Sequence, residues 1–276
     1  MHNHTAYPPM ALERLQNGWS HHSQSDTALQ IQYLATCEST NALLYSRAHH
    51  PNTLLVTEQQ INGKGQFERT WLSQSGDLTF SLGLNIPMAQ LAALSLKVGL
   101  AIAQMFAQRG TGLQLKWPND IIATHPDTSN QGKLAGILVQ SLPDVAQQSA
   151  WVVIGVGLNI APRLMPAGAQ GFAPIGLAQI ASNWVAPEVG AREALIVALV
   201  DAILQTINAA PPANLAPEWN AHDVWHQQSV RLTKPDGALI EGIGLGINSS
   251  GAYQVMQGGQ IHTVQSGQLS APKGAS

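Results

Sequence analysis

Between residues 31 and 227 the chain alternates short apolar runs with longer stretches of helical character. Four runs have the apolar or alternating pattern of buried strands: 54–56, 78–84, 134–140 and 151–160. Two longer stretches predict helices, 88–108, which is rich in Ala and Leu, and 191–209, where apolar residues recur at helical spacing. This succession predicts a large domain in which strands and helices are mixed.

The pattern changes after about residue 228. Four short runs are expected to be strands: 230–232, 240–247, 253–256 and 261–264. Turn signals rich in glycine separate them, which predicts a small β-barrel over residues 228–272. Residues 1–30 are polar, rich in histidine and without clear periodicity, so we expect a loose or partly ordered N-terminal arm.

Charged residues make up 11% of the 276 residues, against about 25% in an average soluble domain, whereas the hydrophobic content is an ordinary 45%. Intrinsic disorder combines low hydrophobicity with high charge, so it is excluded. A protein that binds nucleic acid mainly through phosphates should be basic, but the formal net charge here is −3. The single cysteine, Cys37, excludes a disulfide scaffold and suits a reducing cytosol.

The sequence predicts no membrane span. The longest apolar stretch, 91–106, is interrupted by Ser95, Lys97 and Gln104, whereas a span needs about 20 mostly apolar residues. The first ten residues lack the apolar core and the basic flank of a secretory signal. We therefore expect a cytoplasmic protein without a membrane partner.

A glycine-rich segment offers the first candidate chemistry. Gly63-Lys64-Gly65-Gln66 is followed closely by Arg69 and Trp71. Glycines that flank one cation, with a second cation nearby, allow backbone N–H groups and positive charge to surround an anion. An ordinary surface loop is the alternative, and this segment alone does not decide between the two.

Two further motifs place lysines at the ends of apolar strands. Lys116-Trp117-Pro118-Asn119-Asp120 ends a short strand, and a lysine there is seldom fully buried without a partner. The motif brings Asn119 and Asp120 to a strand end, where α/β proteins often bind ligands. A plain turn made of Pro, Asn and Asp is the alternative. Lys133 begins the strand at 134–140, and Gly136 inside that strand predicts a close approach to its backbone.

Several other site motifs are incomplete in this chain. Gly155-Val156-Gly157 lacks the third glycine of a dinucleotide fingerprint, and Gly132-Lys133 lacks the flanking residues of a P-loop. His222 and His226 have the spacing of a zinc pair on a helix, but the glutamate that accompanies such a pair is missing. A solvated helix face is the favoured interpretation of these histidines.

Taken together, the motifs resemble biotin protein ligases. Six segments follow the order seen in that family: Glu38-Ser39-Thr40-Asn41, 60–65, 69–71, 116–120, 133–138 and 155–159. The resemblance covers about residues 34–270, and the Lys-Trp-Pro-Asn-Asp and Lys-Leu-Ala-Gly-Ile-Leu strings are specific as a pair. It implies an α+β fold of the class II synthetase-like biotin/lipoate ligase type. The catalytic domain over 31–227 would hold a mixed sheet flanked by helices, and residues 228–272 would form an SH3-like barrel.

The resemblance also implies a reaction in two half-steps. ATP activates the carboxylate of biotin as biotinyl-5′-AMP, and the biotin then passes to a lysine of a biotin carboxyl carrier protein. Biotin's carboxylate and the phosphates of ATP repel each other, so cations must offset the repulsion, and Mg²⁺ is expected near Asp120. The protein is expected to act as a monomer or homodimer that binds no nucleic acid.

The resemblance assigns roles to residues of this chain. Lys133, Lys64 and Asp120 are implied as catalytic, with Lys133 against the carboxylate and the α-phosphate. The residues implied for biotin are Ser39, Thr40, Gln60, Gly63, Lys64, Lys133 and Gly136. The residues implied for ATP or the adenylate are Gly65, Arg69, Trp71, Lys116, Asn119, Asp120 and Asn159.

The chain departs from the family pattern in two places. The glycine-rich loop usually carries two cations, but here Lys64 lacks the bidentate reach of a guanidinium and Gln66 has no charge. We expect this loop to hold the adenylate less tightly. The stretch 121–132 is longer than usual and is expected to be a surface insertion.

Two alternatives remain beside the ligase interpretation. A lipoate or octanoate ligase of the same superfamily would share the catalytic fold, although the Lys-Trp-Pro-Asn-Asp string argues against it. A non-catalytic, biotin-responsive regulator is disfavoured because Lys133, Asn119 and Asp120 are all present. The acidic balance and the lack of a pattern for an N-terminal DNA-binding domain also speak against a repressor.

Overall fold

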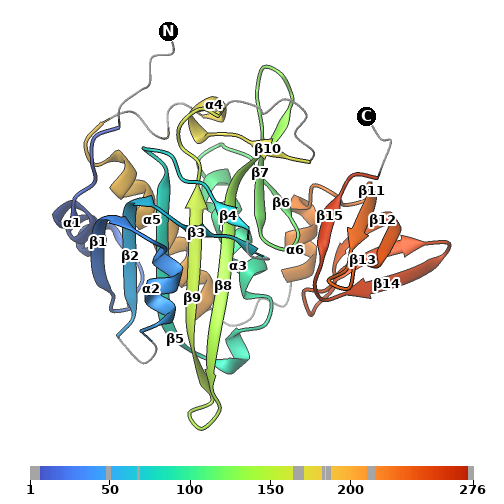
Figure 1. The fold of residues 1–276 in the computed structure, drawn as a ribbon, viewed down its shortest axis with the longest axis horizontal. Coiled ribbons are helices and arrows are strands. Elements are labelled where there is room, and N and C mark those ends of the chain that lie inside the picture. Colours follow the sequence, from blue (N-terminus) through green and yellow to red (C-terminus); the bar gives the residue numbers. More distant parts are fainter. Residues whose placement is uncertain are drawn as a thin grey trace.

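The computed structural model describes residues 7–47, 51–66, 69–163, 171–181, 184, 188–209 and 215–272. Its main sheet runs in the order β1 (Gln30–Cys37), β2 (Thr53–Gln60), β5 (Leu78–Pro87), β9 (Ser149–Leu158), β8 (Gln131–Asp144), β7 (Asp120–Thr124) and β6 (Gln114–Lys116), with β10 (Ala173–Pro174) beside β8 (Figure 1). β1 with β2 and β10 with β8 are parallel, and the other neighbours are antiparallel. The small hairpin β3 (Gly63–Lys64) and β4 (Thr70–Trp71) lies outside this sheet.

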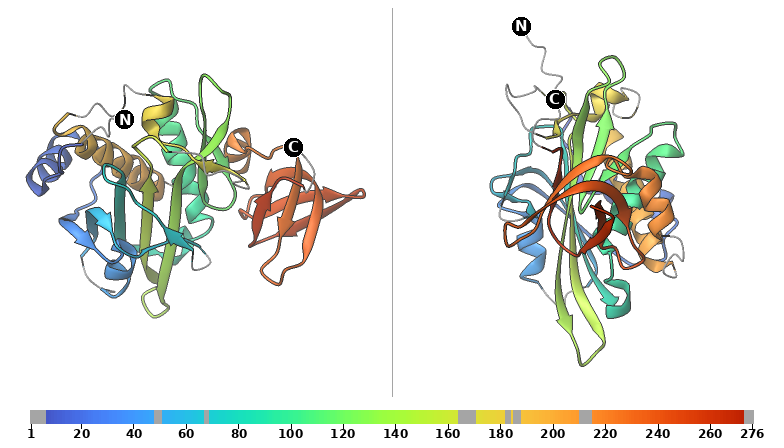
Figure 2. Two further views of the ribbon diagram at one scale, coloured as in Figure 1. Left: turned by 45° about the horizontal axis from the view of Figure 1, so that its top comes forward. Right: turned by 90° about the vertical axis from the view of Figure 1, so that its right-hand side faces the viewer.

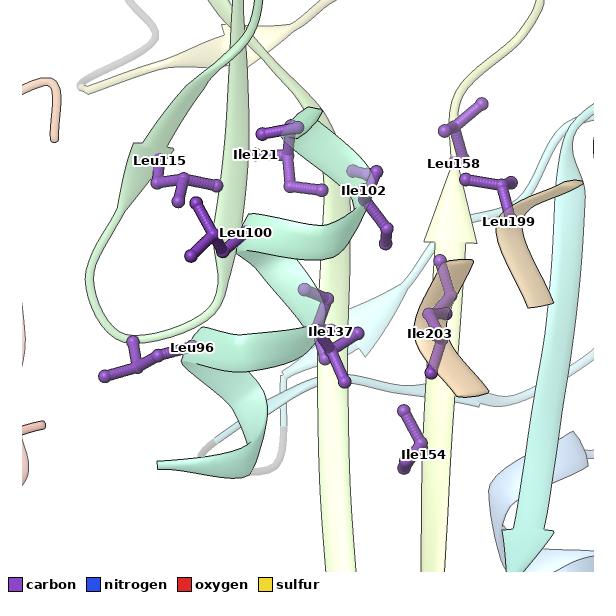
Figure 3. Packing of buried hydrophobic residues seen from close by; sticks show 14 of the residues in the cluster. Leu96, Leu100, Ile102, Leu115, Ile121, Ile137, Ile154, Leu158, Leu199 and Ile203 are labelled. Carbon is purple, nitrogen blue, oxygen red and sulfur yellow. The ribbon is translucent and has the colours of Figure 1, made fainter. Parts of the chain in front are cut away.

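Alternate residues of β9 face two different layers. Val152, Ile154, Val156 and Leu158 belong to the main core, which α3 (Leu94–Ala107) and α5 (Ala191–Asn208) cover. Figure 3 shows side chains of these helices packed over the sheet at Ile137, Ile154 and Leu158. Trp151 and Val153 point to the opposite face, where they pack with Leu44 of the short helix α2 (Thr40–Tyr45). Gly155 and Gly157 continue this second face without side chains, so other residues approach the sheet closely there: Asn41 at Gly155 and Trp71 at Gly157.

The N-terminal segment corrects the expectation of a loose arm, apart from residues 1–6, which lie outside the described residues. Leu12–His22 forms helix α1 beside α5. Ion pairing holds the segment, because Arg14 contacts Glu193 at 2.6 Å and Glu193 also accepts the backbone N–H of Ala11. Glu58 accepts the backbone N–H of Met10, and Arg192 donates to the carbonyl of Pro8. These contacts come from residues that follow far along the chain, so local periodicity gives no sign of the helix.

The structure also corrects the expected surface insertion at 121–132. Ile121, Ile122 and Ala123 are buried in β7, a strand of the main sheet. The exposed connection is limited to the few residues between β7 and β8. The predicted helix at 88–108 begins later, at Leu94, because 88–90 form a separate 3₁₀ turn and Ala93 has a positive φ of 54°.

The C-terminal strands form a second sheet that lies to one side of the main sheet (Figure 2). Its order is β14 (Gln260–Val264), β13 (Tyr253–Gln257), β12 (Leu239–Ile247), β11 (Ser229–Thr233) and β15 (Gln268–Ser270), all antiparallel. The short helices α4 (Leu177–Ile180) and α6 (Leu215–His222) lie between β10 and β11 along the chain. The expected boundary at 227/228 stays a prediction.

Two buried contacts join the barrel to the main sheet. The indole Nε1 of Trp117, in the β6–β7 turn, donates to the carbonyl of Gly251 at 3.2 Å. The hydroxyl of Tyr253 donates to Asp223 at 2.7 Å, and the next residue, Val224, donates its backbone N–H to Leu115 of β6. Both contacts end on β6 or the turn that follows it, so this hairpin is shared between the two sheets.

The buried carboxyl group of Asp223 gives a prediction about pH. Burial raises its pKa to about 6, although hydrogen bonds from Tyr253 and Trp225 and the nearby His226 lower it. The unfolded chain therefore releases this proton at lower pH than the folded protein, and stability falls as the pH rises through 6. Between about pH 4 and about pH 7, we expect the free energy of unfolding of the wild type to fall by about 2–3 kcal/mol relative to that of Asp223→Asn. Urea unfolding at each pH measures this change. Parallel stability curves for the two proteins would contradict this.

Within the described residues, no helix has both the length and the apolar character needed to cross a lipid bilayer.

Candidate active site

One row of residues crosses the face of the main sheet that carries α2. Strand register places Asp120 of β7 opposite Gly136 of β8, Gly136 opposite Gly157 of β9, and Gly157 opposite Thr79 of β5. Thr79 in turn lies opposite Thr57 of β2. Residues directly opposite in a ladder point to the same face. The row therefore has a carboxylate at one end, hydroxyls at the other, and two glycines between them.

The indole ring of Trp71 lies over the two glycines. A Cβ built on Gly157 would come within 2.3 Å of this ring, and one on Gly136 within 3.0 Å. The β3–β4 hairpin carries Trp71 to this position, since Gly63 pairs with Trp71 across it. This is the close approach to the backbone that Gly136 predicts. The remaining cavity has a volume of about 50 Å³.

The cavity has an uncharged polar end. The amide oxygen of Gln60 accepts from the backbone N–H of Thr40 at 2.8 Å and from its hydroxyl at 3.1 Å. The hydroxyl of Ser81 donates to the Thr40 hydroxyl at 2.7 Å. Ser39 caps α2, because its hydroxyl accepts the backbone N–H of Ala42. Hydroxyl and amide groups are thus held in fixed directions at the start of α2.

The opposite end of the cavity is cationic. Nζ of Lys133 lies 2.5 Å from one oxygen of Asp120, and Nζ of Lys116 lies 3.2 Å from the other. Burial would raise the pKa of Asp120, but the two ammonium groups outweigh it and hold the pKa below its usual value. The carboxylate is therefore ionised, and this cluster of three groups has a net charge of +1. Lys133 also lies 5.6 Å from the centroid of the Trp71 ring.

A buried network fixes the backbone that carries Lys133. The side-chain amide of Asn159 donates to the carbonyl of Lys133 at 3.0 Å and accepts from Arg163 at 2.9 Å. Arg163 also pairs with Asp77, a fully buried carboxylate just before β5. Because a guanidinium group only donates, it directs the amide oxygen of Asn159 toward itself and the amide nitrogen toward Lys133.

Asp77 and Arg163 were not predicted from the sequence. They are 86 residues apart, and neither belongs to a motif that the sequence analysis singled out. A charged residue beside each of two strand ends was the only available signal, and such residues are common.

The structure brings many of the predicted site residues to one cavity. Those that line it are Ser39, Thr40, Gln60, Lys64, Gly65, Trp71, Asn119, Lys133 and Gly136. Others stand behind this lining: Gly63 pairs with Trp71, Lys116 and Asp120 contact each other, and Asn159 contacts the Lys133 carbonyl. Arg69 is turned away, since its guanidinium donates to Gln268 of the barrel at 2.6 Å.

Within the described residues, no group of three or more His, Cys, Asp or Glu side chains is arranged to hold a metal ion. His222 ends α6 and its ring contacts the carbonyl of Leu113, while His226 lies beyond the helix. Asp120 is the carboxylate at the cationic end of the cavity, and an ionised carboxylate is the hard oxygen ligand that Mg²⁺ prefers.

Comparisons with known proteins agree with one another. A model of the Biotin/lipoate A/B protein ligase family matches residues 33–159. The biotin--[acetyl-CoA-carboxylase] ligase of Mycobacterium tuberculosis is 32% identical over 254 residues, which cover 87% of this chain and 88% of that protein. The bifunctional ligase/repressor BirA of Salmonella typhimurium is 29% identical over 260 residues, 90% of this chain and 76% of that protein.

Among solved structures, the biotin protein ligase of Aquifex aeolicus in complex with biotin and ATP superimposes with a TM-score of 0.70 at 22% identity. The match covers 87% of this chain and 97% of that chain. It confirms the expected fold, a mixed sheet flanked by helices with a smaller antiparallel C-terminal sheet.

Proposed function

This chain belongs to the biotin protein ligases, within the biotin/lipoate A/B protein ligase family, and from that premise we propose that it activates biotin with ATP and joins it to a lysine of a biotin carboxyl carrier protein. The two-ended cavity is the observation that carries the proposal. Its uncharged polar end, at Thr40 and Gln60, suits the ureido ring of biotin. Its cationic end, at Lys133, suits the place where biotin's carboxylate meets a phosphate.

In the first half-step an oxygen of biotin's carboxylate forms a bond to the α-phosphorus of ATP, and the bond to pyrophosphate breaks. Both reactants are anions, so their approach must be offset by positive charge that is already in place. Lys133 supplies this charge at the cavity wall, and Asp120 and the Asn159 network hold its ammonium group and its backbone in position. Catalysis is then mainly positioning and electrostatic stabilisation.

In the second half-step the amine of the carrier lysine attacks the acyl carbon of the adenylate, and AMP leaves. The glycine-rich loop at 63–66 closes one side of the cavity, and Lys64 and Gly65 line it. We assign Lys116 and Asn119, at the β6–β7 turn, to the nucleotide, and Asn119 lines the cavity. Asp120, whose two oxygens pair with Lys133 and Lys116, would help to hold Mg²⁺. When bound with ATP, Mg²⁺ would offset phosphate charge.

The proposal is tested by ATP–pyrophosphate exchange with biotin, lipoate and octanoate in parallel. We expect exchange with biotin and little with the two other acids. The relatives named for biotin support this choice over the lipoate alternative. Exchange that depends on lipoate or octanoate instead, or no exchange with any of the three, would refute the proposed function.

The glycine-rich loop gives a prediction about release of the adenylate. Gln66 lines the cavity without a charge, where the family loop carries a second cation. A guanidinium at this position adds a charge-assisted hydrogen bond to phosphate, worth about 1.5–3 kcal/mol. We therefore expect Gln66→Arg to release biotinyl-5′-AMP about 10-fold more slowly than the wild type, measured by stopped-flow displacement. Equal release rates would show that the loop's charge does not set retention.

A further inference from the structure

A buried hydroxyl in the candidate active site has no partner. The Oγ1 atom of Thr79 is shielded from solvent and makes no hydrogen bond to any residue that the structure describes. The residue as a whole is 3% exposed. A buried polar group without a partner destabilises the folded protein, so such groups in native proteins usually meet a ligand, a water molecule or a strained neighbour.

Thr79 lies at the uncharged end of the cavity. It lines the cavity together with Thr40 and Gln60. Strand register puts Thr79 beside Gly157 and separates it from Asp120 by two intervening strands. Ser81, two residues along β5 and therefore on the same face, contacts Thr40. The hydroxyl of Thr79 is thus next to the groups that would surround a polar ring, and far from those that would surround phosphates.

Within this cavity the Nε1 atom of Trp71, whose ring lies over Gly157, is also buried without a partner among the described residues. A neighbour in the same row shows that a buried threonine on this face can find one. Thr57 lies directly opposite Thr79 on β2 and is also fully buried. Its hydroxyl donates to the carbonyl of Gln59 at 3.1 Å, and Thr57 does not line the cavity. Valine has nearly the same shape as threonine and suits a strand equally well, so packing alone does not require a hydroxyl at 79.

We propose that Thr79 is a ligand-binding residue whose hydroxyl hydrogen-bonds a polar atom of the biotin ring system, beside Thr40 and Gln60. The inference rests on the proposed function. A hydroxyl both donates and accepts, so it matches either the N–H or the C=O of a ureido ring. A ring without such groups leaves the hydroxyl unpaired, so Thr79 also selects for biotin against a lipoyl group.

The test compares Thr79→Val with Thr57→Val as its matched control, and uses two measurements. Isothermal titration of the purified proteins with biotin gives the dissociation constant, and urea unfolding without ligand gives the midpoint. Thr79→Val is expected to bind biotin about 3–10-fold more weakly and to unfold at an equal or higher urea concentration. Thr57→Val is expected to bind biotin as the wild type does and to unfold at a lower concentration. Thr79→Ser, which keeps the hydroxyl, should restore the affinity.

The opposite signs of the two measurements separate ligand binding from a structural role. Two results would overturn this inference but not the proposed function. One is wild-type affinity in Thr79→Val; the other is a loss of affinity that comes with a lower unfolding midpoint and is not restored in Thr79→Ser. A wild-type protein without affinity for biotin would overturn the proposed function and this inference with it.

Discussion

Replacing Lys133 by alanine is expected to lower the rate of biotinyl-5′-AMP formation by about 10³-fold and to leave the fold intact. The ammonium group lies at the cationic end of the cavity, 2.5 Å from Asp120. Its removal leaves the approach of two anions uncompensated at the point where the new bond forms. The side chain is 31% exposed, so its truncation opens no cavity in the core. ATP–pyrophosphate exchange measures the rate, and circular dichroism verifies the fold.

The matched control for this prediction is Lys234→Ala. Lys234 lies in the β11–β12 turn of the barrel, outside the cavity. Its replacement by alanine removes one ammonium group, as Lys133→Ala does. It should keep the exchange rate of the wild type. If Lys133→Ala also kept that rate, Lys133 would not be the residue that offsets the charge of the reacting anions.

Trp117→Ala is expected to lower the free energy of unfolding by about 3–5 kcal/mol. The side chain is 1% exposed, its indole donates to Gly251, and its ring lies 5.7 Å from that of Tyr253. Truncation removes a large buried surface and also the hydrogen bond that joins the β6–β7 turn to the barrel. Chemical denaturation with urea measures the change.

Trp151→Ala separates the loss of buried surface from the loss of this connection. Trp151 is also buried, and its indole donates to a backbone carbonyl, that of Leu44, but it lies on the α2 side of the sheet. Both variants should lose similar stability. The two variants are compared at urea concentrations equally far below their own unfolding midpoints. Amide hydrogen exchange at residues 248–251 should then be faster in Trp117→Ala and unchanged in Trp151→Ala. Equal exchange in both would mean that Trp117 does not anchor the barrel.

The parts of the fold that the sequence predicted are those whose signal is local. The strands now seen as β8 and β9 are long apolar runs, and the helix at 191–209 is a regular apolar repeat that agrees with α5 to within one residue. The alternation along β9 also separates its core residues from the two glycines that leave space for the site. Such periodicity depends only on neighbours within a few residues.

The parts that the sequence did not predict depend on contacts between distant residues. Helix α1 buries Leu15 but otherwise presents a polar pattern, and its ion pair with Glu193 involves a residue 179 positions later. The length of the 121–132 stretch predicts a surface insertion, whereas Ile121 and Ile122 are buried strand residues. The roles of the individual site residues stay predictions, although many of these residues line one cavity and the side chain of Arg69 does not.

The N-terminal segment has a consequence for the order of events during synthesis. Pro8 and Ala11 are bound by Arg192 and Glu193, which leave the ribosome more than 180 residues later. At about 5–20 residues per second, the first segment waits about 10–40 s for its partners. Helix α1 therefore cannot be an early, autonomous unit of folding, because its docking requires α5. Nascent chains stalled before residue 190 should leave this segment open to protease, and chains stalled well after α5 has emerged should protect it.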